Sequence, residues 1–137
     1  STAKTHLFCL LTSAWMTAAL VTSVQAHSHV DRSEKSMTYH VYISNSGSTF
    51  LSHFLLDSSN GQIEPQDDVS LGAAPGPLAT DAAGRRMFVC LRSEKQFASY
   101  DIDSATGALR QIGVVDVPDG APYVSLDDTD QYLLASY

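Results

Sequence analysis

Two stretches of this chain carry one pattern: Phe54-Leu55-Leu56-Asp57-Ser58-Ser59-Asn60-Gly61-Gln62-Ile63 and, further along, Tyr100-Asp101-Ile102-Asp103-Ser104-Ala105-Thr106-Gly107-Ala108-Leu109. The offset between the aspartates that open the two turns is 103 − 57 = 46 residues. The same offset relates Asp81 to Asp127 without a gap. Repeats of about 40–50 residues built from short strands and turns are typical of β-propeller blades.

Each repeat is predicted to contain four short strands, because apolar and alternating runs are separated by turns rich in glycine, proline and aspartate. A sheet of four strands that packs on its neighbours through both faces is a propeller blade, so the sequence predicts an all-β β-propeller. The four strand types are expected at residues 39–43, 87–91 and 132–135; at 49–56 and 96–102; at 62–71 and 109–117; and at 78–80 and 123–126.

This pattern divides the chain into blades. Residues 39–71 form most of one blade, 78–117 a whole blade, and 123–137 the opening half of a third. The first blade has no inner strand, and the sequence stops inside a predicted strand at Tyr137. We therefore expect an N-terminal piece of a longer propeller, with two to three blades present.

The charge of the chain excludes one class of partner. The formal net charge is −7, and all fifteen acidic residues follow residue 30. An acidic surface repels a phosphate backbone, so nucleic acid is not expected as a partner. Charged residues make up 17% and hydrophobic residues 44% of the chain, which is typical of a packed globular protein.

Residues 1–26 have the pattern of a secretory signal peptide. Lys4 supplies a positive charge, residues 7–24 are largely apolar, and Val24-Gln25-Ala26 offers small residues at the cleavage positions. Serine and threonine dilute the apolar stretch, which favours cleavage over the alternative of an uncleaved N-terminal anchor. We therefore expect an exported protein, periplasmic or extracellular, with no stable membrane span after cleavage.

Residues 27–37 are polar and aperiodic, which predicts a linker before a propeller domain over residues 38–137. His40 and His53 fall inside predicted strands and are expected to be ordinary packed or exposed strand residues. Cys90 is expected to be a buried, inert thiol. The sequence contains no phosphate loop, nucleophile elbow or cluster of metal ligands, so neither a cofactor nor a metal is predicted.

The wording of the second blade resembles a known family. The stretch 103–109 is followed by Gly120-Ala121-Pro122 and then by Gln131-Tyr132-Leu133-Leu134-Ala135-Ser136-Tyr137. This order resembles the blade motif of the lactonase family of seven-bladed β-propellers, which includes 6-phosphogluconolactonase-like and carboxymuconate cyclase-like proteins. Members of that family often have His or Cys directly after the proline that matches Pro122, where this chain has Tyr123 and Val124.

The resemblance implies an exported lactonase-like hydrolase that opens a sugar lactone, with a small anionic or sugar-like ligand. Such a reaction needs an activated water, a donor to the developing oxyanion, and cations to hold an anionic substrate. The family's catalytic residues are expected beyond Tyr137, so none is assigned in this chain. Two other functions stay open: a non-catalytic periplasmic or surface binding propeller, and a muconate cycloisomerase-like enzyme.

Three residues are candidates for substrate binding: Arg92, Lys95 and Tyr137. Propeller geometry places the loops that contain them on one face, together with Asn45, Ser46, Glu94 and Asp119. Arginine offers a bidentate fork to a carboxylate or phosphate, and lysine offers a point charge. The alternative is that this is ordinary charge on a solvated loop.

Overall fold

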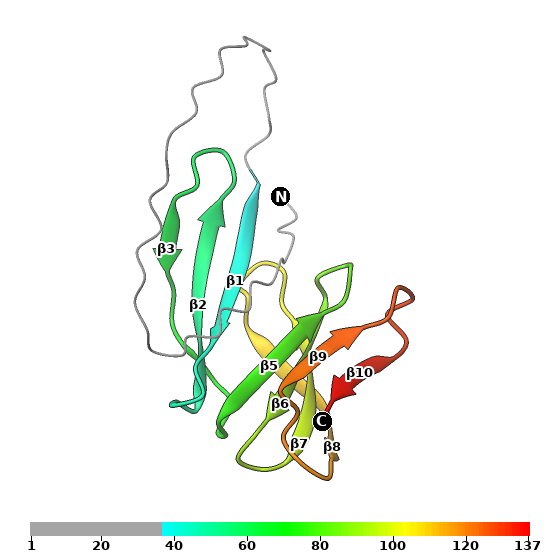
Figure 1. Cartoon of the computed structure of the whole chain (residues 1–137). Helices are drawn as coiled ribbons and strands as arrows, with labels where there is room; N and C mark the ends of the chain where they lie inside the picture. The colour runs from blue at the N-terminus through cyan, green and yellow to red at the C-terminus, as the bar shows by residue number, and fades with distance from the viewer. Residues whose placement is uncertain (1–36) are drawn as a thin grey trace, which may run out of the picture.

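The structure is a computed structural model that describes residues 37–137, and these residues form three antiparallel sheets and no helix (Figure 1). The first blade contains β1 (Thr38–Ser44), β2 (Phe50–Asp57), β3 (Ile63–Pro65) and β4 (Val69–Ser70). β2 pairs with β1 along one edge and with both β3 and β4 along the other.

The second blade is a complete four-stranded sheet in the order β5-β6-β7-β8. Its strands are β5 (Pro75–Thr80), β6 (Arg86–Leu91), β7 (Gln96–Ile102) and β8 (Leu109–Asp116). The third blade begins with β9 (Tyr123–Leu126) and β10 (Leu133–Ser136), which pair with each other. β9 lies beside β5, so successive inner strands are neighbours, as in a propeller (Figure 1).

The turn after β7 shows why the repeated residues produce hairpins. The Asp103 carboxylate accepts hydrogen bonds from the backbone N–H groups of Ala105 and Thr106, at 2.9 Å each. The Gly107 N–H closes the turn on the Asp103 carbonyl at 2.7 Å, and Gly107 has a φ of 75°. Glycine adopts this left-handed conformation without steric cost, which explains its place at the exit of the turn.

The blades are held together by two apolar clusters. The larger one joins the first and second blades and includes Tyr42, Leu51, Met87, Val89 and Tyr100. The smaller one joins the second and third blades and consists of Ala79, Cys90, Ala121 and Val124, with partly buried side chains packed around it. Burial is thus shared between repeats, and no sheet has a core of its own.

The all-β propeller fold predicted from the sequence is confirmed, and the four strand types occur in the predicted order. One element differs: the outer strand expected over residues 62–71 is split into β3 and β4. The Gln66 N–H still donates to the His53 carbonyl of β2 at 2.8 Å, and the exposed Asp67 and Asp68 then leave the ladder between the two pieces. The break leaves a polar segment facing the second blade.

Within residues 37–137, there is no helix with the length and apolarity needed to cross a bilayer. The predicted signal peptide, and the alternative N-terminal anchor, lie outside the described residues. The predicted linker also lies outside them, apart from Met37.

Candidate functional site

The loops predicted to share one face do lie at one end of the blades. The β1–β2 loop, the β6–β7 loop and the β8–β9 connection are all at the lower side of the view in Figure 1. Backbone hydrogen bonds tie the β6–β7 loop in place: the Arg92 N–H donates to the Ala74 carbonyl at 2.9 Å, and the Val117 N–H donates to the Lys95 carbonyl at 2.9 Å. The candidate residues Arg92 and Lys95 therefore lie in a loop whose backbone is fixed by hydrogen bonds to neighbouring segments.

Arg92 lies where the second and third blades meet. Its side chain runs past Gly76, at the start of β5, and past Gly120, just before β9. The residue is exposed, and its guanidinium makes no ion pair or hydrogen bond with any residue of the described part of the chain. An exposed guanidinium without an acidic partner is available to bind an anion.

Lys95 is placed differently. Its ammonium forms an ion pair with the Asp119 carboxylate at 3.6 Å, and both side chains are well exposed. The Gly120 N–H and the Lys95 ammonium hold the pKa of Asp119 below its ordinary value, so the carboxylate stays charged. The positive charge of Lys95 is therefore largely offset by its neighbour.

Tyr137, the third candidate, directly follows β10 and is 70% exposed. The structure brings Arg92, Lys95 and Asp119 around the β8–β9 connection, whereas no hydrogen bond or ion pair within residues 37–137 links the Tyr137 side chain to them.

The opposite end of the inner strands is acidic. A hollow of about 690 Å³ between β5 and β9 is lined there by four aspartates: Asp81, Asp127, Asp128 and Asp130. The Asp127 carboxylate accepts bonds from the N–H groups of its own turn, and Asp130 accepts one from the Ala82 N–H at 2.9 Å. Clefts lined by one sign of charge repel ligands of that sign, so this hollow disfavours an anion.

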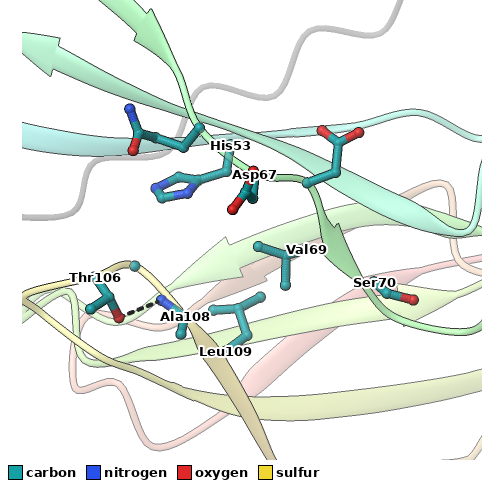
Figure 2. Close-up of a pocket in the computed structure, with 10 residues that line it drawn as sticks. His53, Asp67, Val69, Ser70, Thr106, Ala108 and Leu109 are labelled. Atoms are coloured by element: carbon teal, nitrogen blue, oxygen red, sulfur yellow. Dashed lines mark hydrogen bonds between the residues drawn. The ribbon is translucent and has the colours of Figure 1, made fainter.

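A second site-like feature is a groove of about 400 Å³ between the first and second blades. Figure 2 shows His53 and Asp67 on the first-blade side, facing Thr106, Ala108 and Leu109 of the second blade. The groove lies where the outer strand is split, and the segment 66–68 between β3 and β4 lines it.

A histidine pair sits at the edge of this groove and was not predicted as a pair. His40 and His53 are 2% and 4% exposed, and His40 Nδ1 lies 2.9 Å from His53 Nε2. Tyr42 stacks on His53, with ring centroids 5.0 Å apart, and its hydroxyl donates to the Gly107 carbonyl. The prediction that both histidines are ordinary strand residues, packed or exposed, is confirmed, and both are packed. Their proximity to each other depends on the register of β1 on β2.

Chemistry assigns the protons of this pair. His40 Nε2 lies 3.3 Å from the Ser104 carbonyl, which only accepts, so Nε2 must donate. In the neutral ring, Nδ1 of His40 is then an acceptor and His53 Nε2 the donor to it. Burial, and secondarily the nearby His40, lower the pKa of His53 below its ordinary 6.5. The lowered pKa favours the neutral form of the His53 ring, and the pair connects the first blade to the second.

Other reactive groups in residues 37–137 do not build a second centre. Cys90 is buried, and burial raises the pKa of its thiol despite opposing effects from Ala121 and Arg92. No group of three or more His, Cys, Asp or Glu side chains in the described region is placed to hold a metal ion. The arrangement supports recognition of an anion by Arg92, with the acidic hollow on the far side.

Comparison with known proteins gives a match that covers most of the chain. A family model described as "Lactonase, 7-bladed beta-propeller" matches residues 20–137. No curated protein matches the chain.

Solved structures agree with the fold. A periplasmic gluconolactonase of Pseudomonas aeruginosa is 22% identical, with a TM-score of 0.60, over 72% of this chain and 30% of that one. A putative 6-phosphogluconolactonase of Bacteroides fragilis is 17% identical, with a TM-score of 0.60, over 79% of this chain and 31% of that one. A Lactobacillus plantarum protein is 24% identical, with a TM-score of 0.53, over 86% of this chain and 40% of that one. The chain thus spans less than half the length of these structures, and at such identities the likeness establishes the fold alone.

Proposed function

This chain belongs to the lactonase family of seven-bladed β-propellers, and we propose that the protein hydrolyses a sugar lactone that carries a phosphate or carboxylate group. The observation that carries this proposal is the unpaired Arg92 guanidinium at the seam of two blades. The family membership supports lactone chemistry, and Arg92 supports an anionic substrate.

The proposed reaction is attack of water on the lactone carbonyl, followed by opening of the ring to the hydroxy acid. Arg92 would hold the anionic group of the substrate and so orient the ring, which is the contribution that a positioning cation makes to catalysis. The acidic hollow at the opposite end of the inner strands supports the same orientation, because it repels an anion.

We further propose that the protein acts outside the cytoplasm. The signal-peptide pattern of residues 1–26 supports export. One structural neighbour is described as a periplasmic gluconolactonase, which is consistent with lactone chemistry in an exported propeller.

The test is hydrolysis of 6-phosphogluconolactone and of gluconolactone by the complete protein, followed by titration of the released acid. We expect acceleration over the spontaneous rate, with a lower KM for the phosphorylated lactone. No acceleration with either lactone would refute the proposal.

One observation favours a non-catalytic binding propeller as the second candidate. Within residues 37–137, neither a histidine nor a cysteine lies on the Arg92 face: His40 and His53 are buried in the other seam, and Cys90 is buried. The exposed Tyr123 stands where family members often have His or Cys. Tight binding of a sugar acid without turnover would support this function instead.

A further inference from the structure

Two glycines at the Arg92 seam are not explained by their backbone conformation. Gly76 and Gly120 do not belong to the glycines with positive φ in the described chain, which are Gly61, Gly72, Gly84 and Gly107. Any residue could adopt their backbone angles, so another reason must account for the missing side chains.

The space that a side chain at position 76 would need is occupied by the side chain of Arg92. A Cβ atom on Gly76 would lie 2.8 Å from Arg92 Cγ, 2.9 Å from Cδ and 3.3 Å from Nε. A Cβ atom on Gly120 would lie 3.4 Å from Arg92 Cγ, which is an ordinary van der Waals contact, so only position 76 is sterically closed to a side chain. Contacts below about 3 Å are well inside the optimal carbon–carbon separation, so an alanine at position 76 would force Arg92 to move.

The contacts also give the direction of the side chain. Gly76 meets Cγ, Cδ and Nε in succession, so the stem of Arg92 lies along the start of β5. The backbone cannot follow a displaced stem, because the Arg92 N–H donates to the Ala74 carbonyl and the Ala74 N–H donates to Ser93 Oγ at 3.1 Å. A larger residue at position 76 would therefore swing the guanidinium while leaving the loop in place.

We propose that Gly76 is a positioning residue that holds the Arg92 guanidinium at the seam between the second and third blades, where it selects ligands bearing a phosphate or carboxylate. The identity of the ligand rests on the proposed function. The contact of Gly76 with the stem of Arg92, here called the cradle, rests on geometry alone. If Arg92 served only stability, its guanidinium would be expected to face a carboxylate. The Lys95 ammonium does so in its ion pair with Asp119.

The cradle is tested by a double-mutant cycle on stability in the complete protein. Gly76→Ala, Arg92→Ala and the double variant are compared by thermal denaturation, with Gly47→Ala as the control. Gly47 lies in a loop on the same face, and its Cβ would meet nothing closer than 3.5 Å. We expect Gly76→Ala to lower Tm when Arg92 is present and to have little effect when residue 92 is alanine. Equal losses of Tm in both backgrounds would overturn the cradle, whatever the protein catalyses.

Anion selection is tested by calorimetry with three probes: glucose 6-phosphate, gluconate and glucose. We expect at least one anionic probe to bind more tightly than glucose, and Arg92→Ala to remove this preference, a loss of about 10- to 100-fold for a charge-assisted contact. Gly76→Ala should also lower the affinity for the anionic probe. The double variant should bind this probe no more weakly than Arg92→Ala does, and Gly47→Ala should bind it with unchanged affinity.

The outcomes separate the two proposals. A preference for anions that survives Arg92→Ala, or no preference at all, would overturn the selecting role. Loss of the anion preference in Arg92→Ala, together with an absence of lactone hydrolysis, would uphold the selecting role of Arg92 and refute the hydrolase.

Discussion

Gly107 and Gly61 occupy the same position in the two repeats, yet their surroundings differ. Both have positive φ, at 75° and 73°. A Cβ atom on Gly61 would meet nothing within 4 Å, whereas one on Gly107 would lie 2.6 Å from His40 Nδ1 and 2.6 Å from His53 Nε2. Conformation alone thus requires glycine in the first blade, and conformation and packing together require it in the second.

This contrast predicts the effect of asparagine, which tolerates the left-handed region, at the two positions. We expect Gly61→Asn to cost less than about 1 kcal/mol of unfolding free energy. Gly107→Asn should cost about 1–3 kcal/mol, as overpacking of a tight site does. Urea denaturation of both variants in the complete protein measures the difference, and equal losses would contradict the docking of the histidines on Gly107.

Two buried tyrosines provide a second matched pair. The Tyr42 hydroxyl donates to the Gly107 carbonyl at 2.5 Å, while the Tyr100 hydroxyl is buried and has no partner within the described residues. We expect Tyr42→Phe to destabilise the protein by about 0.5–1.5 kcal/mol, the typical net value of one hydrogen bond. Tyr100→Phe should be neutral or stabilising, since it removes an unsatisfied polar atom. Equilibrium unfolding would contradict this if Tyr100→Phe proved the more harmful change.

At the scale of elements, the seam between the first and second blades is predicted to weaken in acid. The pKa of His53 is lowered by burial and by His40, so the unfolded chain takes up this proton more readily than the folded protein. Stability therefore rises with pH through this window and falls as pH drops below about 6.5.

The other charged groups around the pair are Asp67, Asp68 and Asp103. Asp67 and Asp68 line the groove with His53, and the pKa of Asp103 is lowered mainly by the N–H groups of Thr106 and Ala105. Asp103 therefore contributes a second loss of stability only at lower pH, near and below the ordinary carboxyl range.

The acid effect is measured as the change in unfolding free energy between pH 7 and pH 5. Replacement His53→Gln should flatten this dependence, whereas Gln66→Ala, which changes a non-titrating residue of the same groove, should leave the slope unchanged. A full slope in the His53 variant would show that other groups carry the pH dependence.

The elements were largely predictable from the sequence, while the seams between them were not. Apolar runs and aspartate–glycine turns give strand order and hairpins, because those depend on local conformation. The split of residues 62–71 into β3 and β4 depends on how the exposed segment 66–68 meets the neighbouring blade. Arg92 was predicted as a candidate from its loop, but its freedom from Asp119, which pairs with Lys95 instead, depends on side-chain placement.

One signal for the histidine pair was present in the sequence. Tyr42 lies opposite His53 in the β1–β2 register, and His40 is two residues away on the same face. Diagonal neighbours on one face of a strand pair are within reach of aromatic side chains. A register deduced from the hairpin loop would therefore have placed His40 near His53, although not their contact with Gly107, which comes from another blade.

The molecule as described leaves an apolar flank on the side of the third blade. Phe88, Phe97, Val115 and Leu133 line an apolar groove there, and Val114 and Leu134 are more than half exposed. We expect a polypeptide of residues 38–137 alone to self-associate and to bind a hydrophobic dye, because an uncovered sheet face favours association. Light scattering against concentration measures this, and a stable monomer with cooperative thermal unfolding would contradict it.

The docking of His40 and His53 on the turn of the second blade decides whether the two blades could exchange places. The receiving turn is present in both copies, since Asp57–Gly61 has the same form as Asp103–Gly107. The histidines are not repeated: 46 residues after His40 and His53 stand Arg86 and Ser99. Recombination could therefore exchange the turns between blades, but a first blade moved to another place in the ring would need a glycine turn facing it. The two blades thus share the turn, but only the first has the histidine pair, so the two are not interchangeable.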